Sequence, residues 1–309
     1  MDAISRFVPS IKTNPMNTLK IENLSKTYPN GVKALQGINL TITNGMFGLL
    51  GPNGAGKSSL IRTLATLQEP TQGSILFNDT HSNKEPQIIR NQLGYLPQEF
   101  GVYPKISAIR LLDHIAVLKG ILNSKERKEQ IEGLLHQTNL YAVRKKSVKT
   151  FSGGMRQRFG IAQALLGDPK LIIVDEPTAG LDPEERNRFH NLLSEIGEHR
   201  IIILSTHIVE DIKNLCAHMA IMGEGKILKQ GIPSELITHL EGKIWHKVVA
   251  KENVLAFKNA FNVLSTRLFG GKIELRVLAD HRPEQGFKAS KPDLEDVYFS
   301  TINKQSILY

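Results

Sequence analysis

Short hydrophobic runs and glycine-rich turns alternate along the first part of the chain. The apolar positions predict strand-like structure in five segments: residues 19–28, 37–42, 46–51, 74–79 and 93–97. The third segment runs directly into a glycine-rich loop, and the pattern after that loop predicts a helix from about 57 to 67. The segment at 74–79 indicates a short hairpin. Strands and tight turns are therefore expected to dominate here, with one early helix.

The spacing of apolar residues changes to three and four between about 107 and 167, which is typical of helices. Strand signals then return. Residues 171–177 and 201–207 are continuous apolar runs that end in polar residues, and they predict buried parallel strands with a helix from about 183 to 196 between them. Two further strands are expected at 217–222 and 225–231. The pattern predicts an α/β core that holds a helical insert.

Weaker strand signals follow the core, at residues 243–250, 261–269 and 271–280, before a final helix at 294–302. We divide the chain into an N-terminal extension at 1–17, a core domain at 18–232 with a helical subdomain at about 99–167, and a small C-terminal α+β appendage at 233–309.

Composition supports a globular protein, since 40% of the 309 residues are hydrophobic. No apolar run approaches the roughly 18 to 20 residues that span a bilayer, and the N-terminal segment lacks the apolar stretch of a signal peptide. A cytoplasmic location is the expectation. Cys216 is the only cysteine, which excludes an intramolecular disulfide, and it lies in a helical-looking segment at 208–222. A buried, unreactive thiol is expected.

The formal net charge is +9, which by itself fits nucleic acid, anionic lipid or a polyanionic ligand. Six basic residues without an intervening acidic residue lie between 144 and 158: Arg144, Lys145, Lys146, Lys149, Arg156 and Arg158. They surround a second glycine turn, FSGGMRQR at 151–158. A solvated charged face is the alternative explanation for such a run.

Two glycine turns, GPNGAGKSS at 51–59 and FSGGMRQR at 151–158, each have the character of a phosphate-binding turn that opens a helix. One nucleotide needs only one such turn. The presence of a second turn suggests that this turn contacts a nucleotide bound to another copy of the chain. Function would then require dimerisation.

The first turn satisfies G-x-x-x-x-G-K-[ST], directly after an apolar strand and at the start of a helix. Its glycines let backbone N–H groups curl around phosphate oxygens, Lys57 is expected to reach the β- and γ-phosphates, and the Ser58 hydroxyl is expected to ligate Mg²⁺. The residues expected to bind nucleotide here are Gly51, Pro52, Asn53, Gly54, Ala55, Gly56, Lys57, Ser58 and Ser59.

Acidic residues end the strand at 171–177, where open α/β sheets bind their ligands. Asp175 and Glu176 are adjacent, and neighbouring strand residues point to opposite sides, so the two carboxylates can divide their roles. We expect Asp175 to hold Mg²⁺, directly or through water, and Glu176 to act as the general base for the attacking water. His207 follows the next apolar strand and should reach the same edge near the γ-phosphate. The other histidines are expected to be structural.

Gln98 and Tyr28 are two further candidates at the nucleotide. Gln98 follows the strand at 93–97 and offers an amide oxygen that can complete the Mg²⁺ shell. Its position also allows it to act as a hinge between the core and the helical insert. Tyr28 either stacks on a nucleobase or is a partly buried structural tyrosine.

Taken in this order, these segments resemble the nucleotide-binding subunit of ATP-binding-cassette (ABC) transporters over residues 19–231. Tyr28 matches the adenine-stacking aromatic, residues 51–59 the Walker A loop, Gln98 the Q-loop glutamine and 151–155 the signature. Residues 171–176 match the Walker B strand, AGLD at 179–182 the D-loop, and His207 the switch histidine. The resemblance implies a P-loop NTPase cassette with a mixed sheet, an antiparallel β part and a helical subdomain.

The resemblance also implies ATP and Mg²⁺ as ligands and a head-to-tail homodimer with two ATP molecules at its interface. Each ATP would lie between one subunit's Walker A loop and Ser152, Gly153 and Gly154 of the other subunit. Phe151 and Met155 depart from the usual LSGGQ signature, so the hydrolysis rate is open, whereas phosphate binding should survive.

Aromatic-SGGM signatures with a C-terminal motif such as LEDVY at 294–298 are common in the drug- and antibiotic-export branch of the family, which this chain resembles. Separate membrane permease subunits are implied, with the chain peripheral on the cytoplasmic face of the membrane. Their contact is expected at 99–107, unless Phe100 and Tyr103 pack under their own loop. A soluble cassette ATPase acting on nucleic acid or ribosomes, or a non-hydrolytic scaffold, are the alternatives; with one cassette and an insert of ordinary length, no nucleic-acid partner is expected.

Overall fold

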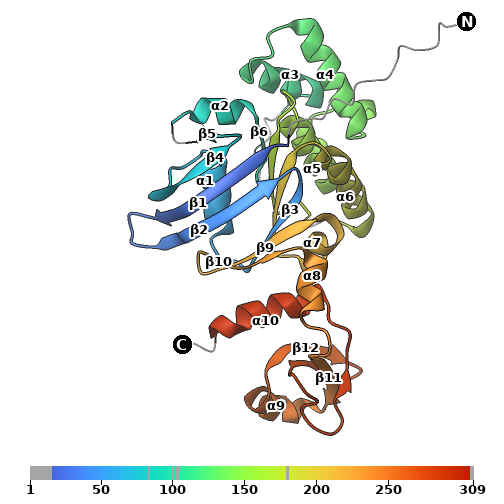
Figure 1. Cartoon of the computed structure of the whole chain (residues 1–309). Helices are drawn as coiled ribbons and strands as arrows, with labels where there is room; N and C mark the ends of the chain where they lie inside the picture. The colour runs from blue at the N-terminus through green and yellow to red at the C-terminus, as the bar shows by residue number, and fades with distance from the viewer. Residues whose placement is uncertain (1–15, 83, 99–100, 102–104, 179–180, 307–309) are drawn as a thin grey trace, which may run out of the picture.

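Three layers and a smaller C-terminal unit make up the computed structural model (Figure 1). It describes residues 16–82, 84–98, 101, 105–178 and 181–306. Most of the extension expected at 1–17 therefore lies outside the described residues, as do Phe100, Tyr103, Ala179 and Gly180. No helix in the described ranges is both long and apolar enough to cross a membrane.

A six-stranded sheet forms the middle layer, in the order β10-β9-β3-β8-β7-β6. Its strands are β10 (Lys226–Gly231), β9 (His218–Gly223), β3 (Gly45–Leu50), β8 (Ile201–Thr206), β7 (Leu171–Asp175) and β6 (Leu93–Leu96). All neighbouring pairs are parallel except β10 and β9, which are antiparallel at the edge. Both faces of this sheet are covered, which explains why the sequence of β7 and β8 is apolar without interruption.

Alternate residues of β8 divide between the two hydrophobic cores, as the pleat of a strand requires. Ile202 and Leu204 pack into the core on the helical side, whereas Ile201 and Ile203 pack into the core on the opposite side. All four side chains are buried. Continuous apolar strands in the sequence thus correspond to a sheet sandwiched between two layers.

The layer on one face is a four-stranded antiparallel sheet together with α1 (Lys57–Leu64). Its strands, in spatial order, are β2 (Lys33–Thr43), β1 (Thr18–Thr27), β4 (Gln72–Phe77) and β5 (Thr80–His81). The hairpin expected at 74–79 is confirmed: Asn78 and Asp79, with φ of 47° and 64°, form the two-residue turn between β4 and β5. The short helix α2 (Pro86–Asn91) precedes β6.

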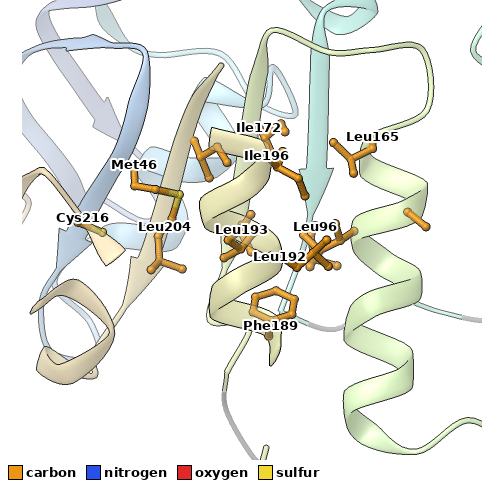
Figure 2. Packing of buried hydrophobic residues seen from close by; sticks show 14 of the residues in the cluster. Met46, Leu96, Leu165, Ile172, Phe189, Leu192, Leu193, Ile196, Leu204 and Cys216 are labelled. Carbon is orange, nitrogen blue, oxygen red and sulfur yellow. The ribbon is translucent and has the colours of Figure 1, made fainter. Parts of the chain in front are cut away.

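Helices cover the opposite face of the central sheet. The helices against the sheet are α5 (Gly153–Ala164), α6 (Pro183–Gly197) and α7 (Val209–Leu215). The helices α3 (Ala108–Leu118) and α4 (Ser124–Gln137) pack on α5, with short 3₁₀ turns at Tyr141–Val143 and Val148–Thr150. Figure 2 shows Phe189, Leu193 and Ile196 of α6 in one cluster of buried side chains that also includes Leu96 and Leu204 of the central sheet. The α3–α4 pair projects from the end of this layer (Figure 1).

The C-terminal unit is a second antiparallel sheet with helices on it. After α8 (Pro233–Thr238), the strands of this unit lie in the order β12-β13-β11-β14. The C-terminal helix α10 (Leu294–Ser306) packs against α7, α8 and β12. The remaining elements are β11 (Ile244–Val249), a 3₁₀ turn (Lys251–Asn253), α9 (Val254–Ala260), β12 (Val263–Phe269), β13 (Lys272–Leu278) and β14 (Lys288–Ala289). Leu294 and Val297 of α10 join the core that underlies the helical layer.

Two local predictions differ from the structure. The helix expected from about 57 to 67 ends at Leu64, because Ala65 caps it and Thr66 adopts a left-handed φ of 57°. Cys216 is not inside a helix, since α7 ends at Leu215 and the chain turns into β9. Its thiol is buried, and burial raises its pKa, which agrees with an unreactive cysteine.

Candidate functional site

Four of the parallel strands end side by side, and the candidate site lies at their carboxyl ends. Leu50 of β3 pairs with Thr206 of β8, Asp175 of β7 pairs with Ser205, and Leu96 of β6 pairs with Val174. The next residues along each strand are therefore delivered to one edge of the sheet. They include the phosphate loop, Glu176, His207 and Gln98.

The phosphate loop is confined to its path by close backbone contacts. A Cβ on Gly51 would lie 2.4 Å from the Met222 carbonyl oxygen, and one on Gly56 would lie 2.5 Å from the Ala34 carbonyl oxygen. Gly56 also has a φ of 101° and is the N-cap of α1. Glycine is required at these two positions for steric reasons, and α1 presents its N-terminal N–H groups toward the loop.

Lys57 is buried inside its own loop. Its Nζ donates to the carbonyl oxygens of Gly51 (2.7 Å) and Pro52 (3.2 Å), and it lies 3.7 Å from Glu176 Oε1. Burial lowers the pKa of Lys57, and the nearby Glu176 and Asp175 carboxylates oppose that shift. The ammonium thus has two neutral carbonyl acceptors and one carboxylate nearby, and phosphate oxygens can replace the carbonyls as charged partners.

Glu176 and His207 are brought together at the sheet edge. His207 Nδ1 lies 2.7 Å from Glu176 Oε2, Glu176 is half-buried, and His207 is exposed. The expectation that Asp175 and Glu176 are neighbours on one strand, with side chains on opposite sides, is wrong for Glu176. The strand ends at Asp175, and Glu176 takes a left-handed φ of 49° while its N–H donates to the Ser205 carbonyl oxygen (2.8 Å).

The Asp175 carboxylate is buried in the same place. Burial raises its pKa, the Glu176 charge adds to the rise, and Lys57 counteracts it. A buried carboxylate with a raised pKa is well suited to a bound cation, because the cation would favour its charged form. The exposed Ser58 hydroxyl lies at the start of α1, directly after the phosphate loop.

Gln98 and Tyr28 are placed near the site in different ways. Gln98 is exposed just beyond the end of β6, and among the described residues it forms no hydrogen bond with Ser58 or Asp175. Tyr28 is half-buried, and its hydroxyl hydrogen-bonds Ser59 Oγ and Gln68 Oε1, each at 3.1 Å. The Tyr28 ring is therefore tied by its hydroxyl to the helix that carries the phosphate loop.

The second glycine turn opens α5 as expected. Ser152 is the N-cap of this helix, and its Oγ accepts a hydrogen bond from Met155 N at 3.2 Å. Ser152 and Gly153 are exposed, so their polar groups are accessible to a ligand that is bound to another protein molecule. Phe151 is buried with its ring edge against Phe159, and Met155 packs against the same core. The two departures from the usual signature therefore serve the packing of the helical layer.

The basic run around this turn is not uniformly available to a ligand. Arg158 is buried, and its guanidinium forms an ion pair with Glu185 of α6 at 3.3 Å. Arg144 stacks on Tyr141, with its guanidinium 3.8 Å from the ring centroid. Four of the six basic residues are exposed: Lys145, Lys146, Lys149 and Arg156. The positive field next to Ser152 comes from these four.

Gly154→Ala is expected to lower the melting temperature, because its new Cβ would lie 2.3 Å from Glu185 Oε2. Arg158 and Arg188 hold that carboxylate in place, so it cannot move without leaving the buried Arg158 unpaired. Overpacking of this kind costs roughly 1–3 kcal/mol. Gly153→Ala is the matched control, since its nearest neighbour would be Leu181 Cδ2 at 4.0 Å. Thermal denaturation that gives the two variants the same melting temperature would contradict the prediction.

A phosphate loop, a buried acidic strand end and a histidine on one sheet edge define the class of phosphate-loop nucleoside triphosphatases. The comparison with known proteins narrows this class. The sequence model of the family "ABC transporter" matches residues 35–179. The linearmycin resistance ATP-binding protein LnrL of Bacillus subtilis (strain 168) is 34% identical over 227 residues, which cover 72% of this chain and 72% of that protein.

The methionine import ATP-binding protein MetN of Photobacterium profundum is 32% identical over 261 residues, covering 80% of this chain and 75% of that protein. A solved dimeric, post-hydrolysis structure of the ATP-binding cassette MJ0796 with ADP and Pi matches with a TM-score of 0.63 and 25% identity. It covers 69% of this chain and 98% of that one. The chain belongs to the ABC transporter family, as an ATP-binding subunit, and it is an ATPase that energises transport.

Several polar residues of the site region give no recognisable signal in the sequence. They are Thr178, Glu185, Arg186, His190 and Asp211, which the structure brings together around α6. His190 and Asp211 are buried on helix faces where apolar residues are the rule, and only the fold reveals the partners that make this possible.

Proposed function

We propose that this chain forms a head-to-tail homodimer that binds two Mg²⁺-ATP molecules and powers export through separate membrane permease subunits. The observation that carries the proposal is the grouping of Lys57, Glu176 and His207 within hydrogen-bond or ion-pair distance at the end of the phosphate loop. Phosphoryl transfer needs little beyond positioning and charge stabilisation, and these residues supply both.

Each residue has a distinct role in the proposed reaction. The loop N–H groups and Lys57 would hold the β- and γ-phosphates, and Glu176 would accept a proton from the attacking water. His207, in contact with Glu176 Oε2, would orient that carboxylate and contact the γ-phosphate. Tyr28, fixed by its hydrogen bonds to Ser59 and Gln68, would present its ring to the adenine.

The residues present fit a magnesium ion. Asp175, Ser58 and Gln98 all offer oxygen ligands, which Mg²⁺ prefers, and the pKa of the buried Asp175 is raised in a way that a cation would reverse. When bound, the ion would neutralise negative charge on the β- and γ-phosphates.

Dimerisation would complete the site. Ser152 and Gly153 are exposed at the N-terminus of α5, and the basic side chains beside them favour an anionic ligand. The phosphate loop of the same subunit opens a different helix, α1, and we assign the γ-phosphate contacted by Ser152 and Gly153 to the partner copy. The cassette MJ0796, to which this chain is similar, has been solved as a dimer.

Export is supported by similarity to the linearmycin resistance subunit and by the SGGM signature together with the C-terminal LEDVY at 294–298. Since a methionine import subunit is also similar, direction has to be tested with the membrane partner. Co-purification from detergent-solubilised membranes should recover a permease whose presence alters ATPase activity, and inverted vesicles should accumulate its substrate on addition of ATP. Recovery of no membrane protein would argue against the permease partnership, and ATP-driven loss from the vesicles against export.

Asp175→Asn is expected to raise the melting temperature of the nucleotide-free protein at neutral pH while abolishing ATPase activity. The folded-state pKa of Asp175 lies above its ordinary value of 3.8, so any stability linked to the protonated carboxyl is lost as the pH rises through the folded pKa. Asparagine removes that penalty, so the variant should melt at a higher temperature than the wild type at neutral pH.

Thermal denaturation at neutral pH and below pH 3.8 checks the prediction, because the advantage of the variant should disappear where the wild-type carboxyl is already protonated. Asp280→Asn is a control on an exposed carboxyl that pairs only distantly with Lys243, at 3.6 Å. A variant with lower stability than wild type at neutral pH would contradict this account of Asp175.

A further inference from the structure

A buried ionic cluster lies behind the candidate site, centred on Asp211 of α7. The Asp211 side chain has no exposed surface. It accepts hydrogen bonds from Thr178 Oγ1 (2.6 Å) and Arg186 Nε (2.8 Å), and His190 Nε2 lies 2.9 Å from it. Burying a carboxylate is unfavourable unless it is paired and hydrogen-bonded, and these three partners meet that requirement.

Asp211 is held in its ionised form by this cluster. Burial alone would raise the pKa of Asp211, but hydrogen bonds from His190, Thr178 and Arg186 outweigh burial and lower the pKa below its usual value. The cluster therefore places a permanent negative charge between α6 and α7, and it gives Thr178 a strong, charged acceptor.

The partners of Asp211 come from the segments that carry the reacting groups. Thr178 lies two residues after Glu176, and Asp211 lies four residues after His207. Thr206, which directly precedes His207, accepts a hydrogen bond from Ile208 N (3.0 Å) and has its hydroxyl 3.5 Å from Asp211 Oδ2. The cluster thus ties the chain following Glu176 to the chain on either side of His207.

The backbone at Glu176 needs such support. Its φ of 49° is a conformation that a non-glycine residue adopts at a cost of about 1 kcal/mol or more, and it persists only when the surroundings hold it. One restraint is the hydrogen bond from Glu176 N to the Ser205 carbonyl oxygen (2.8 Å). The Thr178 hydroxyl provides the next restraint along the chain.

We propose that Thr178 and Asp211 are positioning residues that set the placement of Glu176 relative to His207. The inference rests on the proposed function, in which Glu176 accepts the proton of the attacking water. Neither Thr178 nor Asp211 contacts nucleotide in this scheme, so their removal should affect kcat and leave ATP affinity unchanged. A displaced general base also leaves ATP bound for longer, which prolongs the ATP-bound dimer.

The test compares Thr178→Val with Thr178→Ser in the full-length protein. Valine keeps the shape of the side chain and removes the hydroxyl, while serine keeps the hydroxyl and removes the methyl group. Asp211 retains Arg186 and His190 in both variants, so both are expected to fold. Thr178→Val should lower kcat by roughly 10- to 100-fold, a range typical of small misplacements of a reacting group.

Three measurements accompany kcat: the Kd for ATP, the melting temperature and the lifetime of the ATP-bound dimer on a sizing column. The proposal requires an unchanged Kd and a longer-lived dimer for Thr178→Val, with Thr178→Ser close to wild type. It is overturned if Thr178→Val keeps wild-type kcat, if valine and serine lower kcat equally, or if only the melting temperature falls.

Glu176→Gln, measured in parallel, separates this inference from the proposed function. If Glu176→Gln retains turnover, the assignment of the general base fails whatever Thr178 does. If Glu176→Gln loses turnover and Thr178→Val does not, only the positioning inference fails.

Discussion

Glu176→Gln is expected to lower kcat for ATP hydrolysis by about 10²- to 10⁴-fold, the usual contribution of a general base. Glutamine has the same shape as glutamate and keeps a carbonyl oxygen toward His207, but it cannot accept a proton from water. Glu176 Oε2 lies 2.7 Å from His207 Nδ1, and Oε1 lies 3.7 Å from Lys57 Nζ, so the carboxylate is the meeting point of the two other reacting groups.

ATP affinity should survive this change, because the phosphate loop and Lys57 are untouched. With binding intact and hydrolysis slow, the variant should accumulate as an ATP-bound dimer. The assays are steady-state ATPase activity, ATP Kd, and sizing chromatography with and without ATP. Glu195→Gln, an exposed carboxyl on α6, serves as the control. Wild-type turnover in Glu176→Gln would rule out Glu176 as the general base. A variant that stays monomeric in the presence of ATP would argue against an ATP site shared between two subunits.

The parts of this site that are formed by residues adjacent in the chain could be predicted from the sequence. The contacts between residues that are far apart in the chain could not. The phosphate loop requires residues that are neighbours in the chain, so GPNGAGKSS at 51–59 carries the full signal. The strands that deliver Asp175 and His207 are continuous apolar runs, and their shared edge follows from parallel pairing.

The left-handed backbone of Glu176 is a tertiary effect that no local pattern reveals. It arises because β7 ends at Asp175 while Glu176 N bonds to Ser205 of the neighbouring strand. The Asp211 cluster is hidden for the same reason, since its members lie on three segments that only the fold brings together.

The basic run at 144–158 shows how position in the fold changes the meaning of a sequence pattern. All six residues contribute equally to a charge count, but Arg158 faces inward and pairs with Glu185. Gly154 is then explained by the same pair, because the Glu185 carboxylate occupies the space of a Cβ. A glycine that the sequence assigns only to phosphate binding therefore also has a packing role between α5 and α6.

Lys57→Met is expected to abolish measurable ATPase activity and to weaken ATP binding by roughly 10- to 100-fold, the equivalent of losing one charge-assisted interaction of about 1.5–3 kcal/mol. Methionine preserves the apolar stem and removes the charge. The ammonium donates to the Gly51 and Pro52 carbonyls, and burial lowers its pKa, so phosphate oxygens would stabilise its charge further.

A second result is expected from Lys57→Met in thermal denaturation. The buried Lys57 charge mainly stabilises bound phosphate, so its removal should cause little loss of stability in the nucleotide-free protein. The rise in melting temperature on adding ATP should largely disappear. Differential scanning fluorimetry with an ATP titration measures both quantities, and Lys125→Met, at an exposed position of α4, is the control. A full ATP-dependent rise in melting temperature for Lys57→Met would show that the phosphates are bound without this lysine, and would remove it from the proposed site.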